Sequence, residues 1–170
     1  MLKLIQPALE YEEQVNEYVK EHLEHGENEL SASKGLASAK SYKEWLDKVI
    51  AEEEIPKENW VRNNTYLVIR EEDDRLIGLL NIRKEDNDRV LEWAGHIGYG
   101  VRPTERRKGY ASEILRLALD ECRRIGMKKV MLGCHQDNIG SKKTIEKNKA
   151  VYEREVMAEG KPAFVYWIEL

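Results

Sequence analysis

One strongly amphipathic segment, residues 110–125, constrains the fold most, because a strand-like segment lies on either side of it. Its apolar side chains recur at helical spacing, and Gly126 follows as a stop signal. Leu91 to Val101 precedes it and Val130 to Cys134 follows it. A strand, a helix and a strand in this order predict a β–α–β unit whose helix covers a sheet. The apolar face of the helix consists of Ala111, Ile114, Leu115, Ala118, Cys122 and Ile125.

The other segments add strands and helices around this unit. Residues 65–70 and 75–83 are rich in β-formers and predict a hairpin around a charged turn. Further strands are predicted at residues 2–6, 91–101, 130–134, 151–157 and 163–169, and further helices from Pro7 to Gly26, from Ser41 to Pro56 and over residues 139–148. We therefore expect an α+β chain, with a mixed sheet of about seven strands and helices on its faces, folded as a single domain over residues 1–170.

The composition excludes several classes of protein. A chain of 170 residues with 41% hydrophobic residues has the length and the apolar content of one globular domain. The net charge of −4 argues against a nucleic-acid partner. Two cysteines, Cys122 and Cys134, are too few for a disulfide framework, and no apolar run reaches the roughly 18 residues of a membrane span. We expect a soluble, cytoplasmic protein that binds neither nucleic acid nor membrane and can form a homodimer.

The segment with the clearest chemical signal is the basic loop at residues 101–111, V-R-P-T-E-R-R-K-G-Y-A. The first turn of the helix that follows offers free N–H groups and the positive end of its dipole, which together bind anions. Gly109 and the small Ala111 let a phosphate approach the backbone. The loop carries Arg102, Arg106, Arg107 and Lys108 in an otherwise acidic chain. The loop predicts a pyrophosphate site; a solvated basic turn that caps the helix is the alternative.

Three elements in this region resemble the GNAT superfamily of N-acetyltransferases. Arg106 to Ala111 matches the family's pattern of Gln or Arg, two residues, Gly, one residue, and Gly or Ala. The preceding I-G-Y-G-V-R-P resembles its fourth strand, and Asn138 to Ser141 resembles its N-x-x-A or N-x-x-S element. The close resemblance covers about residues 90–150, whereas residues 1–89 match in element order. The phrases GHIGYGVRPTERRKGYA and DNIGSKKTIEKN are most similar to a poorly characterised bacterial group of predicted acetyltransferases.

The resemblance implies a GNAT-type, mostly antiparallel, twisted sheet, acetyl-CoA as the cofactor and no metal. Val101 would hold the pantetheine arm and the acetyl carbonyl through its backbone, where the fourth and fifth strands separate. The N–H groups of residues 106–111 would bind the pyrophosphate, Asn138 the pantetheine chain, and Ser141 would lie near the thiol. The implied cofactor-binding residues are Val101, Arg106, Arg107, Lys108, Gly109, Tyr110, Ala111, Asn138 and Ser141.

The catalytic groups are less defined. Many members of the superfamily have a proton-donating Tyr at the position that is Ile145 here, so the thiolate would leave with help from water, Ser141 or Tyr152. Glu92 and His96 are the candidate bases that would deprotonate the acceptor amine. The alternative is that Glu92 is a turn carboxylate and His96 a hydrogen-bonded strand residue.

The function predicted from these motifs is transfer of the acetyl group of acetyl-CoA to a primary amine of a small molecule or peptide. One alternative is a non-catalytic acyl-CoA-binding regulatory module, which the Ile145 substitution favours. A nucleic-acid-binding domain is the second alternative, against which the acidic balance argues. The acidic residues of the N-terminal half fit a cationic acceptor or a solvated face equally well.

Overall fold

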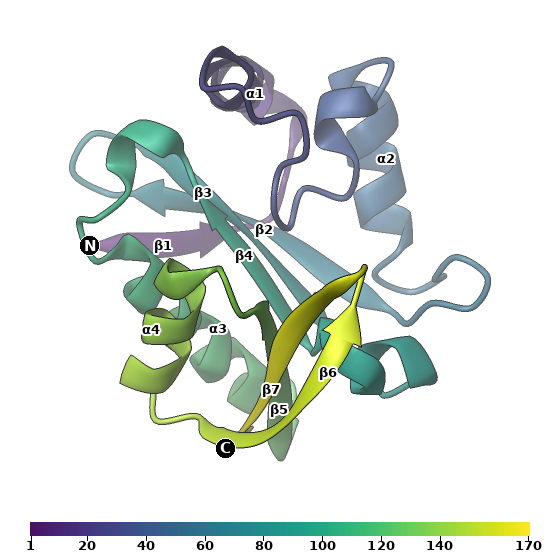
Figure 1. Cartoon of the computed structure of the whole chain (residues 1–170). Coiled ribbons are helices and arrows are strands. Elements are labelled where there is room, and N and C mark those ends of the chain that lie inside the picture. Colours follow the sequence, from purple (N-terminus) through teal and green to yellow (C-terminus); the bar gives the residue numbers. More distant parts are fainter.

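Two antiparallel sheets form the centre of the molecule, described for residues 1–170 by a computed structural model (Figure 1). The first sheet has the strand order β1-β2-β3-β4 and the second the order β5-β7-β6. The strands are β1 (Leu2–Ile5), β2 (Asn63–Arg70), β3 (Arg75–Arg83), β4 (Ile97–Val101), β5 (Lys129–His135), β6 (Val151–Ala158) and β7 (Lys161–Glu169). The predicted α+β fold with seven strands is confirmed, and the strands divide between two sheets.

Helices lie on both sides of the first sheet (Figure 1). One side carries α1 (Glu12–Glu24) and α2 (Tyr42–Ala51), and the other side carries α3 (Tyr110–Arg124) and α4 (Ile139–Lys147). Short helical turns occur at Leu9–Tyr11, Leu36–Ser38, Val90–Ala94 and Pro103–Glu105. None of these helices has both the length and the apolar character needed to cross a membrane.

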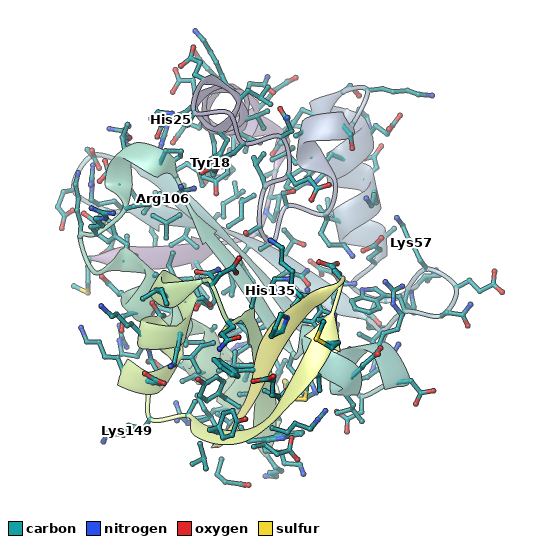
Figure 2. All side chains as sticks on the ribbon, viewed as in Figure 1. Tyr18, His25, Lys57, Arg106, His135 and Lys149 are labelled. Carbon is teal, nitrogen blue, oxygen red and sulfur yellow. The ribbon has the colours of Figure 1, made fainter.

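Each helical layer has its own core. The layer of α1 and α2 packs on the face of β2 and β3 that carries Leu67 and Leu79, and the larger core surrounds α3 between the two sheets. Tyr18 points from α1 toward the sheet and is fully buried, whereas His25 and Lys57 project into solvent (Figure 2). The predicted start of α2 is confirmed, because Ser41 Oγ accepts a hydrogen bond from the N–H of Glu44 at 3.1 Å.

The predicted central helix is confirmed as α3. Its buried residues are Ile114, Leu115, Ala118, Leu119 and Cys122, spaced as one face of a helix. Glycines in the left-handed region stand at both ends: Gly109 is the N-cap, and Gly126 lies just beyond the C-cap, each with φ of 87°. The face predicted to be apolar therefore packs into the core, and the first turn of α3 is left at the surface.

The predicted strand over residues 91–101 is wrong in its first half. Val90–Ala94 forms a π-helical turn that begins with a hydrogen bond from Val90 N–H to Asn87 Oδ1 at 2.8 Å, and β4 begins at Ile97. Gly95 has φ of 70°, and a Cβ there would lie 2.5 Å from Met131 O. The left-handed glycine reverses the chain at this point and separates the turn from the strand.

The two sheets touch at one place and then part. Gly95 forms an isolated bridge with Leu132 of β5. His96 continues the contact: its N–H donates to Met131 O, and its Nδ1 accepts from the N–H of Met131, both at 2.8 Å. The remaining residues of β4 pair with β3 alone. The fourth and fifth strands therefore separate from Ile97 onward, toward the start of α3.

Candidate functional site

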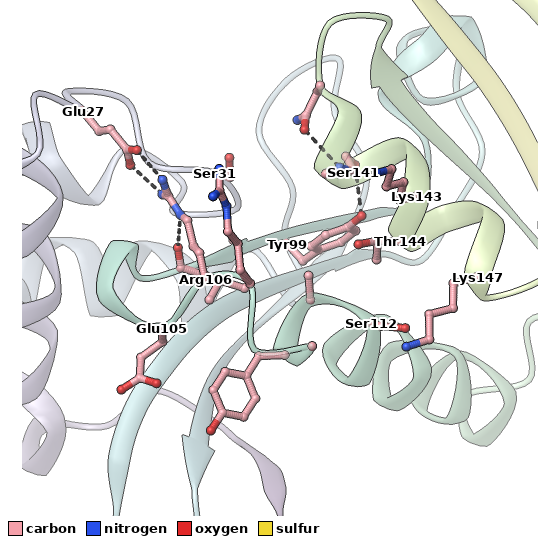
Figure 3. A pocket seen from close by; sticks show the side chains of 18 of the residues that line it. Glu27, Ser31, Tyr99, Glu105, Arg106, Ser112, Ser141, Lys143, Thr144 and Lys147 are labelled. Atoms are coloured by element: carbon pink, nitrogen blue, oxygen red, sulfur yellow. Dashed lines mark hydrogen bonds and ion pairs between the residues drawn. The ribbon is translucent and has the colours of Figure 1, made fainter.

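A cleft of about 690 Å³ opens where β4 ends and α3 begins, and we call it the central cleft. Its walls come from the end of β4, the first turn of α3, α4 and the segment after α1 (Figure 3). Among the residues predicted to bind the cofactor, Lys108 does not line this cleft. The predicted residues that do line it are Val101, Arg106, Arg107, Gly109, Tyr110, Ala111, Asn138 and Ser141.

The start of α3 presents a row of free backbone donors. The N–H groups of residues 107–111 make no hydrogen bond within the protein, because the first helical turn has no preceding carbonyl to bind. Arg107 and Gly109 have left-handed φ angles of 62° and 87°, which bend the loop tightly before the helix. A Cβ at Gly109 would meet no atom within 4 Å, so the space before the loop is open. Free donors at the positive end of a helix suit a phosphate group.

Basic side chains without acidic partners surround the cleft. Arg107, Lys143 and Lys147 are exposed, line the cleft and form no ion pair. The adjacent Arg106 and Lys108 are each paired with a carboxylate. Since the whole chain has a net charge of −4, the unpaired cations concentrate positive potential at this opening. They complement the several phosphates of a nucleotide cofactor.

Arg106 has a structural role in addition to its place in the loop. Its Nη1 and Nη2 donate to the Glu27 carboxylate at 2.6 and 2.8 Å, and its Nε donates to Val101 O at 3.0 Å (Figure 3). The bonds from Arg106 lower the pKa of Glu27 to about 2 against the opposing effect of burial. Lys108 is also engaged, since its Nζ donates to Glu105 at 2.9 Å. Arg106 therefore fixes the segment after α1 to the end of β4.

A hydroxyl pair spans the cleft between β4 and α4. Asn138 caps α4 by accepting a hydrogen bond from the N–H of Ser141 at 3.0 Å, which leaves its Nδ2 without a partner at the cleft. Ser141 Oγ lies 3.0 Å from the hydroxyl of Tyr99 on β4 (Figure 3). Burial raises the pKa of Tyr99 to about 12, so this hydroxyl keeps its proton over the physiological range. The pair brings a proton donor to the cleft wall.

The sequence matches the Acetyltransferase (GNAT) family over residues 32–149, which is more than half of the chain. The chain belongs to the GNAT acetyltransferase family. Among curated protein sequences, no significant match is found. The predicted family and enzyme class are therefore confirmed by the family match, which covers the basic loop and α4.

Solved GNAT structures share the fold at low sequence identity. MccE, the microcin C7 self-immunity acetyltransferase in complex with acetyl-CoA and AMP, superposes with a TM-score of 0.74 at 14% identity, over 99% of this chain and 92% of its own. RimL, the ribosomal L7/L12 α-N-protein acetyltransferase in complex with coenzyme A, gives 0.72 at 15%, over 99% and 94%. A variant of the spermidine N-acetyltransferase SpeG from Vibrio cholerae gives 0.64 at 15%, also over 99% and 94%.

In this GNAT domain the two predicted bases lie outside the central cleft. Glu92 stands exposed on the π-helical turn. His96 is 2% exposed, and both ring nitrogens are engaged: Nδ1 accepts from Met131, and Nε2 donates to Asp86 at 2.7 Å. Burial lowers the pKa of His96, which favours this neutral form. The placement argues against direct contact between either side chain and a substrate in the cleft.

The residue at the position where many relatives carry a proton-donating Tyr is buried and cannot contact a ligand in the cleft. Ile145 is 1% exposed and belongs to the core around α3. Tyr152 stands on β6 against Phe164 and Tyr166 and does not line the cleft. Tyr99 is therefore the tyrosine hydroxyl nearest to Ser141 in the cleft wall, a role that the glycine-rich sequence around it did not reveal.

His22, in the last turn of α1, and Glu27, just beyond the end of this helix, also line the cleft. Because Glu27 is ionised, His22 Nδ1 carries the hydrogen and donates to it at 2.7 Å. His22 Nε2 is buried without a partner, so it cannot reach a ligand in this conformation. The sequence signal for this pair was a histidine followed by an acidic residue just past a helix end, which is too common to single out.

A second hollow, which we call the side pocket, lies on the other side of Glu29. Its volume is about 370 Å³, and Glu29 lines both it and the central cleft. Its lining comes from the segment between α1 and α2 and from Asn81 and Arg83 on β3. The two hollows thus share one exposed carboxylate.

Proposed function

We propose that this protein transfers the acetyl group of acetyl-CoA to a primary amine of a small molecule or peptide. The observation that carries the proposal is the row of unbonded N–H groups at residues 107–111, which faces a cleft with unpaired cations. Backbone donors at a helix start bind a pyrophosphate, and Arg107, Lys143 and Lys147 complement further phosphates. The named relatives support the assignment, since their structures hold coenzyme A or acetyl-CoA or carry acetyltransferase names.

The split between β4 and β5 provides room for the rest of the cofactor. Beyond His96 the edge of β4 that faces β5 has no strand partner, so its backbone groups are free to bind an extended chain. Asn138 Nδ2 is a free amide donor on the opposite wall. Val101 remains part of this edge, although its carbonyl already accepts from Arg106. Bound acetyl-CoA would supply an activated acetyl group and a thiol leaving group.

Two further residues of the cleft are candidates for the proton transfers. Glu29 is placed to take the proton from the acceptor amine, because it lines both the central cleft and the side pocket. The neutral amine nitrogen then forms the bond to the acetyl carbon as the carbon–sulfur bond breaks. Tyr99, paired with Ser141, is placed to give its proton to the departing sulfur.

Cofactor binding is tested by the melting temperature in the presence of acetyl-CoA. A ligand that binds the folded state raises it by mass action. The substitution Gly109→Asp places a carboxylate in front of the free N–H groups, where a side chain meets open space. We expect millimolar acetyl-CoA to raise the melting temperature of the parent protein and to leave the melting temperature of Gly109→Asp unchanged.

Gly160→Asp is the matched control, because Gly160 also has a positive φ, of 77°, and open space around its Cβ, but lies in the β6–β7 turn. It should lose a similar amount of intrinsic stability and keep the full acetyl-CoA response. A parent protein whose melting curve does not respond to acetyl-CoA would refute the proposal. Binding without acetyl transfer to any amine would favour the non-catalytic acyl-CoA-binding module.

A further inference from the structure

The side pocket contains an arginine without an acidic partner. Arg83, at the end of β3, donates from Nη1 to the carbonyl oxygens of Ala94 and Gly95, each at 2.9 Å, and forms no ion pair. Its Nη2 makes no hydrogen bond and is not fully buried. Since Arg83 lines the side pocket, Nη2 is the donor that a ligand there can reach.

Two further cations lie near this guanidinium: Lys34, which is paired with Glu52 at 2.8 Å, and Arg89, which forms no ion pair. Lys34 and Arg89, like Arg83 itself, stand over the ring of Trp60, with the Arg83 group at 5.5 Å from the ring centre. Arg83 Nε is buried without an acceptor. Burial lowers the pKa of Arg83 to about 10, because a half-buried cation is costly without a counter-charge. An anion bound in the side pocket would relieve this cost.

A hydrogen-bond acceptor without a partner also lies beside the side pocket. Asn81 lies two residues before Arg83 on the same face of β3 and lines the same pocket. Its Nδ2 has three acceptors, while its buried Oδ1 accepts no hydrogen bond. Opposite Asn81 stands Gly98 of β4, and Arg83 Nη2 lies 3.3 Å from the position of a Cβ there. No side chain separates the guanidinium from the β4 backbone.

We propose that the acceptor is a free amino acid, and that Arg83 binds its carboxylate in the side pocket while its amine reaches Glu29. The inference rests on the acetyl transfer proposed above and specifies its acceptor. The pocket volume of about 370 Å³ suits one small zwitterion. Arg83, a cation without a counter-charge in the lining, would repel a polycation such as a polyamine.

Matched acceptors test this inference on the wild-type protein. The release of free coenzyme A is measured with each amino acid, with its carboxamide and with the amine that lacks the carboxyl group. We expect kcat/KM for the preferred amino acid to exceed that for its carboxamide by about 100-fold, because a site built for a polar group rejects analogues without it. Equal use of the carboxamide, or no turnover with any amino acid, would overturn the inference.

Variants then assign the preference to Arg83. Arg83→Gln should raise KM for the amino acid by about 100-fold and affect the slow reaction of the carboxamide much less, so that the preference between the two acceptors is lost. Arg89→Gln is the control, because it removes a neighbouring positive charge that does not line the pocket. It should change the kinetics of neither the amino acid nor the carboxamide. Gly98→Ala narrows the space before Nη2 without removing an Arg83 hydrogen bond, and should also raise KM for the amino acid.

The acetyl-CoA response of the melting temperature separates the two proposals. If acetyl-CoA stabilises the protein and amines without a carboxylate are acetylated as well as amino acids, the acetyltransferase assignment stands and the role of Arg83 is refuted. An amino-acid preference that persists in Arg83→Gln would also refute that role. If acetyl-CoA itself has no effect, the assignment of function fails first.

Discussion

The hydroxyl of Tyr99 shows how much of the site depends on where single side chains lie. In the sequence Tyr99 is one residue between Gly98 and Gly100, and its neighbours drew attention to the backbone. In the structure its ring packs against the core around α3 and its hydroxyl meets Ser141. Burial disfavours the phenolate and raises the pKa to about 12, which keeps a proton available next to the cleft. Ile145 lies in the core and offers no proton, and Tyr99 is the donor that we propose in its place.

The proposed base and acid should respond differently to pH. Glu29→Gln should lower kcat/KM by about 100-fold at neutral pH, because the acceptor ammonium then loses its proton without help. The deficit should shrink as the pH approaches the amine pKa of about 10, since more amine arrives neutral. Tyr99→Phe should lower kcat by about 10-fold at every pH up to 10, because a group with a pKa of about 12 stays protonated throughout.

Rates of coenzyme A release across the pH range, for each variant beside the parent, measure both effects. Glu24→Gln serves as the control, because Glu24 is an exposed carboxylate on the same side of the fold and is absent from both hollows. A deficit in Glu29→Gln that stays constant with pH would exclude it as the base. A falling alkaline limb that disappears in Tyr99→Phe would show that the pKa of this tyrosine is much lower in the enzyme at work.

At the scale of elements, local patterns predicted what local forces decide. The apolar stripe of α3, the β2–β3 hairpin and the turn with free N–H groups at residues 107–111 all depend on neighbouring residues, and the structure contains each of them. The strand predicted at residues 91–101 failed because a run of apolar residues fits a strand or a helical turn. The left-handed Gly95 and its contact with Met131, distant in sequence, decide between them.

Long-range pairing is the part that the sequence could not reveal. The basic loop was predicted to offer its cations to phosphates, but Arg106 binds Glu27, which is 79 residues away along the chain. Lys143 and Lys147 of α4 line the cleft instead, where the spacing of α4 gave no reason to expect them. The division into two sheets is equally non-local, because it follows from where the pairing of β4 with β5 stops.

His96 illustrates this junction and can be tested as a structural element. Its imidazole accepts a hydrogen bond from the N–H of Met131 on β5, in place of a backbone carbonyl of a paired strand. The side chain therefore satisfies the β5 backbone at the point where the two sheets separate. His96→Gln should lower the free energy of unfolding by about 1–3 kcal/mol, because it leaves the Met131 N–H without its acceptor. His96→Asn keeps an acceptor near the position of Nδ1 and should retain more of the bond.

The pH dependence follows from the lowered pKa of His96. The neutral form makes the bond, so its contribution is present above the unfolded pKa of about 6.5 and is lost as the pH falls through the lower folded value. Urea denaturation near neutral and acidic pH measures both effects. Folded His96→Asn and His96→Gln should still acetylate within a few-fold of the parent rate. Loss of all turnover in both folded variants would restore His96 as a catalytic base.

Across the whole molecule, ion pairs connect α1 to the basic loop at residues 101–111. Glu21 on α1 accepts from Arg102 Nε at 2.8 Å and from the N–H and hydroxyl of Thr104 at 2.9 and 2.8 Å. Glu27 binds Arg106 a few residues further along. These contacts hold the N-terminal layer against the segment between β4 and α3. The acidic surplus of the chain is thus partly used to position the basic loop, while the unpaired cations face the cleft.

This connection should make the fold sensitive to acid. Burial alone would raise the pKa of Glu21, but the hydrogen bonds from Thr104 and Arg102 outweigh it and lower the pKa to about 2. A carboxylate with a lowered pKa stabilises the fold above its unfolded pKa and loses that contribution as the pH falls through the folded value. Glu21→Gln should therefore cost on the order of 3 kcal/mol at neutral pH, and the difference from the parent should vanish near pH 2. Glu24→Gln on the same helix, which removes an exposed pair with Lys20, should cost less than about 1 kcal/mol at any pH. Urea denaturation at a series of pH values measures this difference in stability. A Glu21→Gln deficit that persists undiminished in acid would show that Glu21 contributes through packing. Its charge would then not hold α1 to the basic loop.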